Sequence, residues 1–300
     1  MECSLCPRKC NIDRASSKGF CGETNAVRIS RAALHFYEEP SISGKEGSGA
    51  VFFAGCNLKC VFCQNIDISR GNAGKEVSIE RLSDIFIELQ NQDANNINLV
   101  TPSHYVLQIK EALIAAKDKG LSIPIVYNSS AYELPETLKI LDGLIDVYLP
   151  DFKYMDDEMA VNYSNAPSYS SYAKEAIAEM FRQVGEPLLD DHGMMKKGVI
   201  VRHLLMPLGV RNAKAVVDYL HETYGDKIYI SLMNQYTPML DSAVLLRAGE
   251  SHPELLRKVT KREYEKLLDY VLSLNIKNAY FQEDGTASES FIPEFDYTGV

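Results

Sequence analysis

Short apolar runs rich in β-branched residues recur along the chain and predict buried β-strands. Six such runs occur: AVFFAGC (50–56), INLVTP (97–102), IPIVYNSS (123–130), LIDVYLPDF (144–152), GVIVRHLLMP (198–207) and KIYISLMNQY (227–236). Nearly continuous apolar runs are typical of strands that are covered on both faces, as in a parallel sheet. Each run ends in polar residues, so each predicted strand leads into side chains that are able to bind a ligand.

Helical patterns alternate with these runs. The segment after Ser78 repeats its apolar residues every three or four positions, which predicts a helix with Ser78 as its N-cap. Gly120 is a natural residue to follow the end of a helix, and Pro135 suits a first helical turn. Thr260 and Glu263 have the spacing of a capping box, which predicts the start of another helix.

Strand and helix units that alternate six times predict an α/β fold. Six units are too few for a closed eight-stranded barrel, so we expect a partial, laterally open (βα)6 TIM-like barrel over residues 50–300. A cysteine-rich N-terminal extension, residues 1–49, precedes it. An open doubly wound sheet is the alternative. In both architectures the chemistry takes place at the carboxyl ends of the strands.

Composition narrows the classes of partner. The 300 residues carry a net charge of −10, which argues against a sequence-independent nucleic-acid binder, since such proteins need a basic face. No apolar run approaches the roughly 20 residues of a membrane span, and the first residues lack the apolar core of a signal peptide. We therefore expect a cytoplasmic protein without a membrane partner. Thiols stay reduced there, so clustered cysteines indicate metal ligands.

The seven cysteines fall into two groups. Cys56, Cys60 and Cys63 follow the first predicted strand with C-x3-C-x2-C spacing. Three thiolates hold three irons of a cubane cluster and leave the fourth iron open, whereas a distorted zinc site with a distant fourth ligand is the alternative. The other group has C-x2-C-x3-C-x10-C spacing, and its four thiolates are enough to complete either a zinc site or a cubane cluster. The third alternative is that these thiols are reduced and bind no metal. The members of this group are Cys3, Cys6, Cys10 and Cys21.

The first cysteine motif, with Phe62 directly before its third cysteine, resembles that of the radical S-adenosylmethionine (SAM) superfamily. The stretches NLVTPSHY, DVYLPDFKY, VRHLLMP and YISLMNQYTP are similar to a branch related to pyruvate formate-lyase activating enzyme. The resemblance implies a [4Fe–4S] cluster whose open iron binds SAM. It implies reductive cleavage of SAM to a 5′-deoxyadenosyl radical, which abstracts hydrogen from a substrate. It also implies an electron donor such as flavodoxin or ferredoxin, and a protein as the candidate substrate.

Side chains at the strand ends are the candidate SAM ligands. Lys153 is similar to the lysine that approaches the SAM carboxylate in this family, and Thr101 stands where the superfamily often has a Gly-Gly-Glu-like stretch. Phe62 is a candidate to stack on adenine. The remaining candidates are Asn128, Ser130, Asp151, Arg202, His203 and Asn234.

Structural alternatives stand beside these roles. Asp151 and Lys153 also suit a surface ion pair, and Phe62 and His203 also suit the core. Asn and Ser side chains at strand ends also serve in turns. Strand alternation aims one of Arg202 and His203 into the barrel.

The sequence thus predicts a radical SAM oxidoreductase that resembles an activating enzyme for a glycyl radical enzyme. The rival hypotheses are radical modification of another protein or a small molecule, and a non-catalytic iron–sulfur or zinc protein. For Glu38 and Glu39 we expect a salt-bridged structural role.

Overall fold

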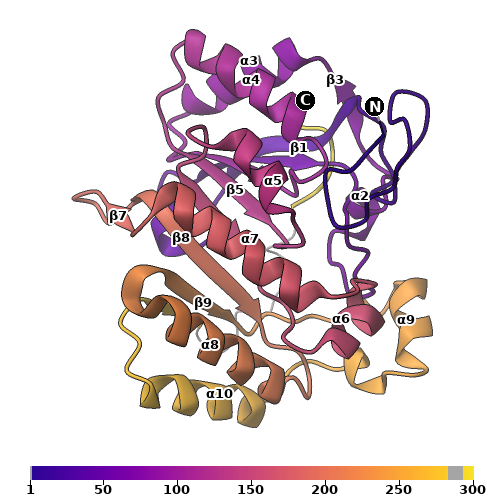
Figure 1. Cartoon of the computed structure of the whole chain (residues 1–300), viewed down its shortest axis with the longest axis vertical. Coiled ribbons are helices and arrows are strands. Elements are labelled where there is room, and N and C mark those ends of the chain that lie inside the picture. The colour runs from indigo at the N-terminus through magenta and orange to yellow at the C-terminus, as the bar shows by residue number, and fades with distance from the viewer. Residues whose placement is uncertain (1, 283–292) are drawn as a thin grey trace.

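The computed structural model describes residues 2–282 and 293–300 (Figure 1). Its strands are β1 (Val27–His35), β2 (Ser48–Phe53), β3 (Lys75–Val77), β4 (Ile97–Val100), β5 (Ile125–Ser129), β6 (Val147–Pro150), β7 (Leu188–Leu189), β8 (Met195–Leu204), β9 (Tyr229–Met233) and β10 (Ala279–Phe281). Its α-helices are α1 (Pro40–Ser43), α2 (Ile66–Ser69), α3 (Ile79–Gln90), α4 (Val106–Asp118), α5 (Pro135–Leu138), α6 (Asp157–Ser164), α7 (Tyr169–Val184), α8 (Val210–Tyr224), α9 (Ala243–Gly249) and α10 (Lys261–Ser273). Short 3₁₀ helices span Lys139–Leu141, Gly225–Lys227 and Pro253–Leu256.

One sheet runs through the molecule in the order β10-β9-β8-β6-β5-β4-β2-β1-β3, with β7 paired to β8. The strands from β2 to β10 on this path are parallel and follow their order in the chain without reversal. A doubly wound sheet would reverse its strand order, so that alternative is wrong. Within the described residues no pairing joins β10 to β3, which is consistent with a partial barrel. All six predicted strands are present.

Several elements lie outside the predicted pattern. β1, from the cysteine-rich first 49 residues, pairs antiparallel with both β2 and β3, so this extension supplies the strand next to the edge strand β3 of the same sheet. β10 adds a seventh parallel strand. The polar stretch 153–172 contains α6 and the start of α7, and the connection 237–259 contains α9.

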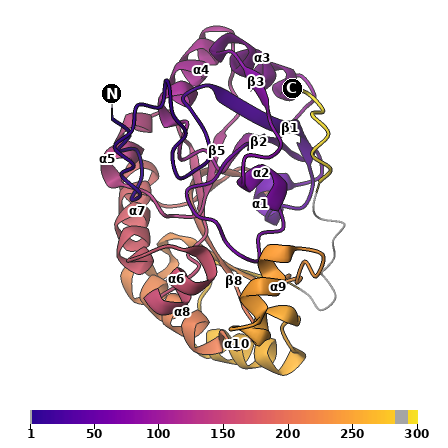
Figure 2. The same ribbon diagram turned by 90° about the vertical axis from the view of Figure 1, so that its right-hand side faces the viewer.

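The core lies on both faces of the sheet. α3, α4, α7, α8 and α10 form an outer crescent, and α1 lies on the concave side (Figure 2). Ile42 of α1 packs inside the barrel against apolar side chains from three strands, and we call this group the lumen cluster. Its buried members are Ile42, Val126, Val147, Leu149, Met195 and Ile200. The short α1 therefore fills the barrel interior on the amino-terminal side of the residues at the carboxyl ends of the strands.

The predicted helix boundaries are confirmed where a cap was identified. The Ser78 side chain accepts a hydrogen bond from the Arg81 amide, and Thr260 and Glu263 form the capping box. Gly120 has a φ of 97°, the left-handed conformation that ends a helix at low cost in a glycine. Pro135 occupies the first turn of α5.

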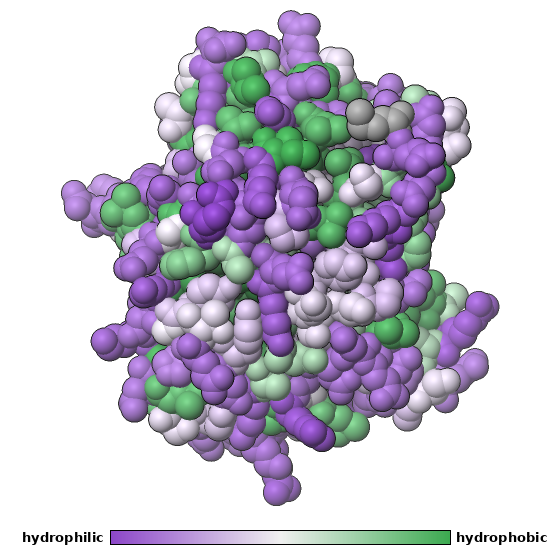
Figure 3. Space-filling view, in the orientation of Figure 1, coloured by the Kyte–Doolittle hydropathy of each residue, from purple (hydrophilic) through white to green (hydrophobic). Residues whose placement is uncertain are grey.

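The molecular surface seen in Figure 3 is mostly hydrophilic, with apolar side chains scattered over it. In the part of the chain that the structure describes, every helix is too short or too polar to cross a membrane.

Candidate functional site

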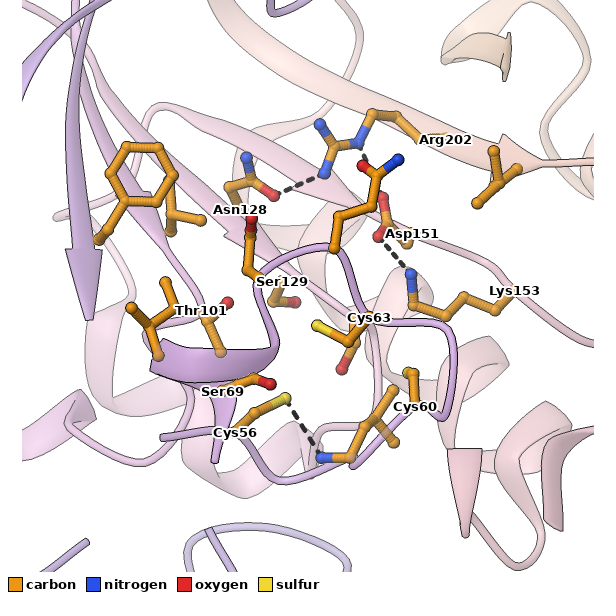
Figure 4. Close-up of a pocket in the computed structure, with 18 of the residues that line it drawn as sticks. Cys56, Cys60, Cys63, Ser69, Thr101, Asn128, Ser129, Asp151, Lys153 and Arg202 are labelled. Carbon is orange, nitrogen blue, oxygen red and sulfur yellow. Dashed lines mark hydrogen bonds and ion pairs between the residues drawn. The ribbon is translucent and has the colours of Figure 1, made fainter. Parts of the chain in front are cut away.

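A cavity of about 290 Å³ opens at the carboxyl ends of the parallel strands (Figure 4). Its lining comes from the segments that follow β2, β4, β5, β6 and β9, and from the end of β8. This is the edge of the sheet at which barrels of this kind place their chemistry. Polar and sulfur-bearing side chains in the lining include Glu38, Cys56, Cys60, Cys63, Ser69, Thr101, Asn128, Ser129, Ser130, Asp151, Lys153, Arg202 and Gln235.

The three cysteines of the C-x3-C-x2-C motif lie in the loop after β2 and all line this cavity. The Leu58 amide donates to Cys56 Sγ at 3.4 Å, and Ser164 Oγ donates to Cys60 Sγ at 2.9 Å. Burial raises the pKa of Cys56 and of Cys60, so these thiols stay protonated until a metal binds. Among the described lining residues there is no fourth cysteine. The donor set therefore fits a cubane cluster with one iron left open.

A charged network occupies the opposite side of the cavity (Figure 4). Arg202 donates through Nε to Asp151 at 2.8 Å, through Nη1 to Glu38 at 2.8 Å, and through Nη2 to Asn128 at 2.7 Å. Lys153 Nζ donates to the other oxygen of Asp151 at 2.6 Å. Two cations thus hold one carboxylate in a fixed orientation at the cavity wall.

The ionisation of this network follows from burial and pairing. Burial alone would raise the pKa of Asp151, but Arg202 and Lys153 outweigh it and lower that pKa. Burial would lower the pKa of Lys153, but Asp151 and Cys60 raise it. Asp151 and Lys153 are therefore both charged at neutral pH. Their side chains are only 17% exposed, so this is a partly buried pair rather than a surface one.

Glu38 and Glu39 reach the network from the segment between β1 and α1. Glu38 accepts from Arg202 and from the amides of Asn98 and Asn128, so the expected salt-bridged role is confirmed for it. Glu39 is buried, and its Oε2 lies 3.9 Å from Arg202 Nη1. Burial raises the pKa of Glu39 to about 7. Sequence reasoning missed that Glu38 also lines the cavity, because its partner is 164 positions away in the chain.

The structure brings most of the other candidates to the same place. Thr101, Asn128 and Ser130 line the cavity from the ends of β4 and β5. Thr101 has a φ of 60°, a left-handed conformation that is costly for a β-branched residue and typical of functional sites. Phe62 lines the cavity and packs edge-on against Tyr236, with ring centroids 5.9 Å apart.

Two candidates lie outside the cavity lining. Strand alternation points Arg202 into the barrel and His203 to the outer face, where its Nδ1 is 2.7 Å from the Phe152 carbonyl oxygen. Burial lowers the pKa of His203 to about 4, as for a neutral core histidine. Asn234 follows β9, and its backbone N–H donates to Gln282 Oε1, while the neighbouring Gln235 lines the cavity instead.

The N-terminal cysteine group lies directly beside the first one. The Cys56 amide donates to the Cys21 carbonyl at 3.2 Å, which joins the two segments. Among the described residues, no three His, Cys, Asp or Glu side chains converge as the ligands of a single metal ion do. This holds for both groups of thiols.

A search of known proteins identifies the family. The sequence model of the radical SAM superfamily matches residues 50–207, more than half of the chain. The chain belongs to the radical SAM superfamily. Membership implies a [4Fe–4S] cluster and SAM as cofactors, and the three-thiol cavity fits them. The uncharacterized protein MJ0674 of Methanocaldococcus jannaschii is 29% identical over 290 residues, which cover 93% of this chain and 77% of that protein.

Solved structures share the fold. SuiB of Streptococcus suis bound to S-adenosylmethionine superposes with a TM-score of 0.51 at 15% identity, over 77% of this chain and 48% of SuiB. HydG, a maturase of the [FeFe]-hydrogenase, gives 0.51 at 15% identity, over 79% of this chain and 52% of HydG. This radical SAM chain therefore spans about half the length of either structure, and the likeness is one of fold.

Proposed function

We propose that this radical SAM enzyme cleaves SAM reductively and abstracts hydrogen from a substrate. The observation that carries the proposal is the set of three thiols, Cys56, Cys60 and Cys63, facing one cavity at the strand ends. Together they would hold a [4Fe–4S] cluster and leave one iron for SAM. When bound, this pair of cofactors supplies a 5′-deoxyadenosyl radical. A flavodoxin or ferredoxin would supply the electron.

Lys153 is the side chain best able to bind the SAM carboxylate. Its ammonium has three N–H donors, of which one goes to Asp151. Arg202 has five, of which three go to Asp151, Glu38 and Asn128. We therefore assign direct contact to Lys153, and to Arg202 the positioning of Asp151 and Asn128.

The remaining candidates suit the other parts of SAM. Thr101, with nearby backbone carbonyls, is assigned to the amino group. Ser130 and Asn128 are assigned to the ribose hydroxyls, and Phe62 to the adenine face. For Asn128 this role is shared with its bonds to Glu38 and Arg202.

A charge-removing variant tests the assignment of Lys153. Lys153→Met is expected to weaken SAM binding about tenfold to hundredfold, because a charge-assisted hydrogen bond contributes about 1.5–3 kcal/mol. Lys119→Met is the matched control, since Lys119 is exposed and pairs with Asp84 far from the cavity lining. Equilibrium dialysis with anaerobically reconstituted protein measures both. Equal affinity of the two variants for SAM would contradict the assignment of Lys153 to the SAM carboxylate.

For the substrate, we propose the backbone glycine of a partner protein, as for an activating enzyme. The sheet leaves its two edge strands unpaired with each other in the described residues, and Tyr37 at the cavity is 57% exposed. Support also comes from a structure of SuiB bound to its precursor peptide SuiA, which has a TM-score of 0.50 at 15% identity. The rival proposal is radical modification of another protein or of a small molecule.

Isotope transfer separates these substrates. A glycyl radical enzyme from the same genome, labelled with α-deuterated glycine, would be mixed with the reduced enzyme and SAM. The activase proposal predicts deuterium in 5′-deoxyadenosine by mass spectrometry and a glycyl radical signal by electron paramagnetic resonance (EPR). Formation of 5′-deoxyadenosine without deuterium would favour the rival substrates.

A further inference from the structure

The four N-terminal cysteines gather into one group, which the proposed SAM chemistry does not use. The sulfurs of Cys10 and Cys21 lie 3.6 and 3.4 Å from the position that a Cβ on Gly19 would take. Cys6 is close enough to Cys10 and Cys21 for their charges to act on it, and Cys3 acts likewise on Cys21. Residues separated by up to 18 positions are thus folded close together.

The backbone presents this group as thiolate-binding loops do. The Phe20 amide donates to Cys10 Sγ at 3.3 Å, which parallels the bond from the Leu58 amide to Cys56 Sγ. Hydrogen bonds to sulfur are one of the means by which proteins tune iron–sulfur clusters. Cys6 and Cys21 are buried, 8% and 7% exposed, whereas Cys3 and Cys10 are partly exposed.

The segment that carries this group is locked onto the loop of the first motif. Gly55 has a φ of 84°, and a Cβ there would lie 2.8 Å from the Cys21 carbonyl oxygen and 2.5 Å from Glu23 Cγ. Only glycine allows so close an approach. Together with the bond between the Cys56 amide and the Cys21 carbonyl, this holds the two groups of thiols at adjoining positions.

Arg8 lies between the two groups. Its Nε donates to the Asn57 carbonyl at 2.8 Å, and its guanidinium stacks 3.8 Å from the Phe20 ring centroid. Its charge acts on Cys6, Cys10 and Cys56. Its Nη2 is buried and has no hydrogen-bond partner in the described part of the chain. An unsatisfied buried guanidinium N–H beside two thiol groups suits anions on both sides.

The neighbouring site favours a cluster over zinc. A single zinc ion needs four sulfurs at about 2.3 Å from one point, whereas a cubane cluster spreads its thiolates over four irons. Membership of the radical SAM superfamily assigns the adjoining group, Cys56, Cys60 and Cys63, to a cluster, and four further thiolates supply the complete protein ligand set of a second one.

We infer that Cys3, Cys6, Cys10 and Cys21 bind a second, coordinatively complete [4Fe–4S] cluster adjoining the one at Cys56, Cys60 and Cys63, with Arg8 as the cation between them. This deepens the proposed function, since it gives the SAM site a neighbouring iron–sulfur centre. It rests on that proposal only for the first cluster.

Native mass spectrometry of the anaerobically reconstituted full chain is the first test and needs no variant. Two clusters predict about eight irons and eight sulfides per chain. One cluster plus one zinc ion, or one cluster with four free thiols, would overturn the inference.

Matched cysteine variants then locate each cluster. Cys10→Ser and Cys3→Ser remove partly exposed thiols and are each expected to leave about four irons and an EPR signal that still shifts when SAM is added. Cys60→Ser is expected to leave about four irons and a signal that SAM does not shift. Full iron content in both N-terminal variants would overturn the site. These readouts do not depend on SAM cleavage, so failure of the proposed function would be seen separately.

A variant of Arg8 tests the adjoining arrangement. Arg8→Gln removes a positive charge that favours the reduced, more negative form of each cluster, so both reduction potentials are expected to fall in an EPR-monitored titration. Lys18→Gln, at an exposed position of the same segment, is the control. A shift of neither potential, or an equal shift in the control, would contradict the placement of Arg8 between two clusters.

Discussion

Arg202 is the residue on which the cavity wall depends most. It joins Asp151, Glu38 and Asn128, which come from three separate parts of the chain. Arg202→Met would leave Glu38 without a cation and Asp151 with Lys153 alone. Removing one partner of a buried ion pair costs about 3–5 kcal/mol, so a loss of this size is expected in the free energy of unfolding measured with denaturant.

An exposed arginine provides the control for this variant. Arg81 pairs with Glu88, and their side chains are 36% and 48% exposed, at the surface where ion pairs contribute little to stability. Arg81→Met is therefore expected to change the free energy of unfolding only slightly. Equal losses in the two variants would show that the network around Arg202 is not held by its charge.

Glu133 predicts a pH dependence of stability. It is fully buried and accepts hydrogen bonds from Ser103 and Tyr127, while its Oε2 has no partner among the described residues. Burial raises its pKa from 4.5 to about 7. The folded state therefore holds a proton that the unfolded state releases, and stability falls by up to about 3 kcal/mol as pH rises from about 4.5 to 7.

A neutral replacement isolates this effect. Glu133→Gln cannot ionise, so its melting temperature should fall less than that of the wild type between pH 5 and pH 8. Burial also raises the pKa of Glu39 to about 7. Glu39 is therefore expected to keep part of the fall in melting temperature with pH in both proteins. If the melting temperatures of the wild type and the variant fall equally with pH, Glu133 ionises freely in the folded state.

At the scale of elements, α1 fills the barrel interior with a single turn. Ile42 is fully buried in the lumen cluster, so Ile42→Ala leaves a cavity there. Such a change costs about 2–5 kcal/mol, measurable by denaturant unfolding. Leu107→Ala, in α4 at a position 42% exposed, is the control and should cost far less. A small effect at Ile42 would mean that the barrel interior closes without α1.

The elements also show what a sequence does and does not predict. The six parallel strands were predictable because strands buried on both faces are continuously apolar. β1 was not, because VRISRAALH is an antiparallel strand between β2 and the short edge strand β3, with charged residues at intervals. α1 has only four residues, too few for a periodic signal.

The residues of the candidate site also divide into those that the sequence predicts and those that it does not. Cys56, Cys60 and Cys63 were predictable because metal ligands close in sequence keep a fixed spacing. Alternation showed that only one of Arg202 and His203 faces the barrel interior, but choosing between them requires the face of β8 to be known. Glu38 was beyond local reasoning, since its place in the cavity depends on a contact with distant Arg202.

At the scale of the whole molecule, the N-terminal segment, the barrel and the tail form one sheet-centred body. Residues 297 and 298 pair with β1, because the Tyr297 amide donates to the Ser30 carbonyl and the Ala32 amide donates to the Thr298 carbonyl, so the tail packs beside β1. β1 in turn pairs with β2, the strand that leads into the three-cysteine loop.

The most direct measurement of the central claim is the release of 5′-deoxyadenosine. Anaerobically reconstituted protein would be mixed with SAM and dithionite, and the products separated by liquid chromatography with mass detection. The wild type is expected to form 5′-deoxyadenosine and methionine in equal amounts, and Cys60→Ala to form neither. Wild-type protein with a full complement of iron that leaves SAM intact would contradict the account.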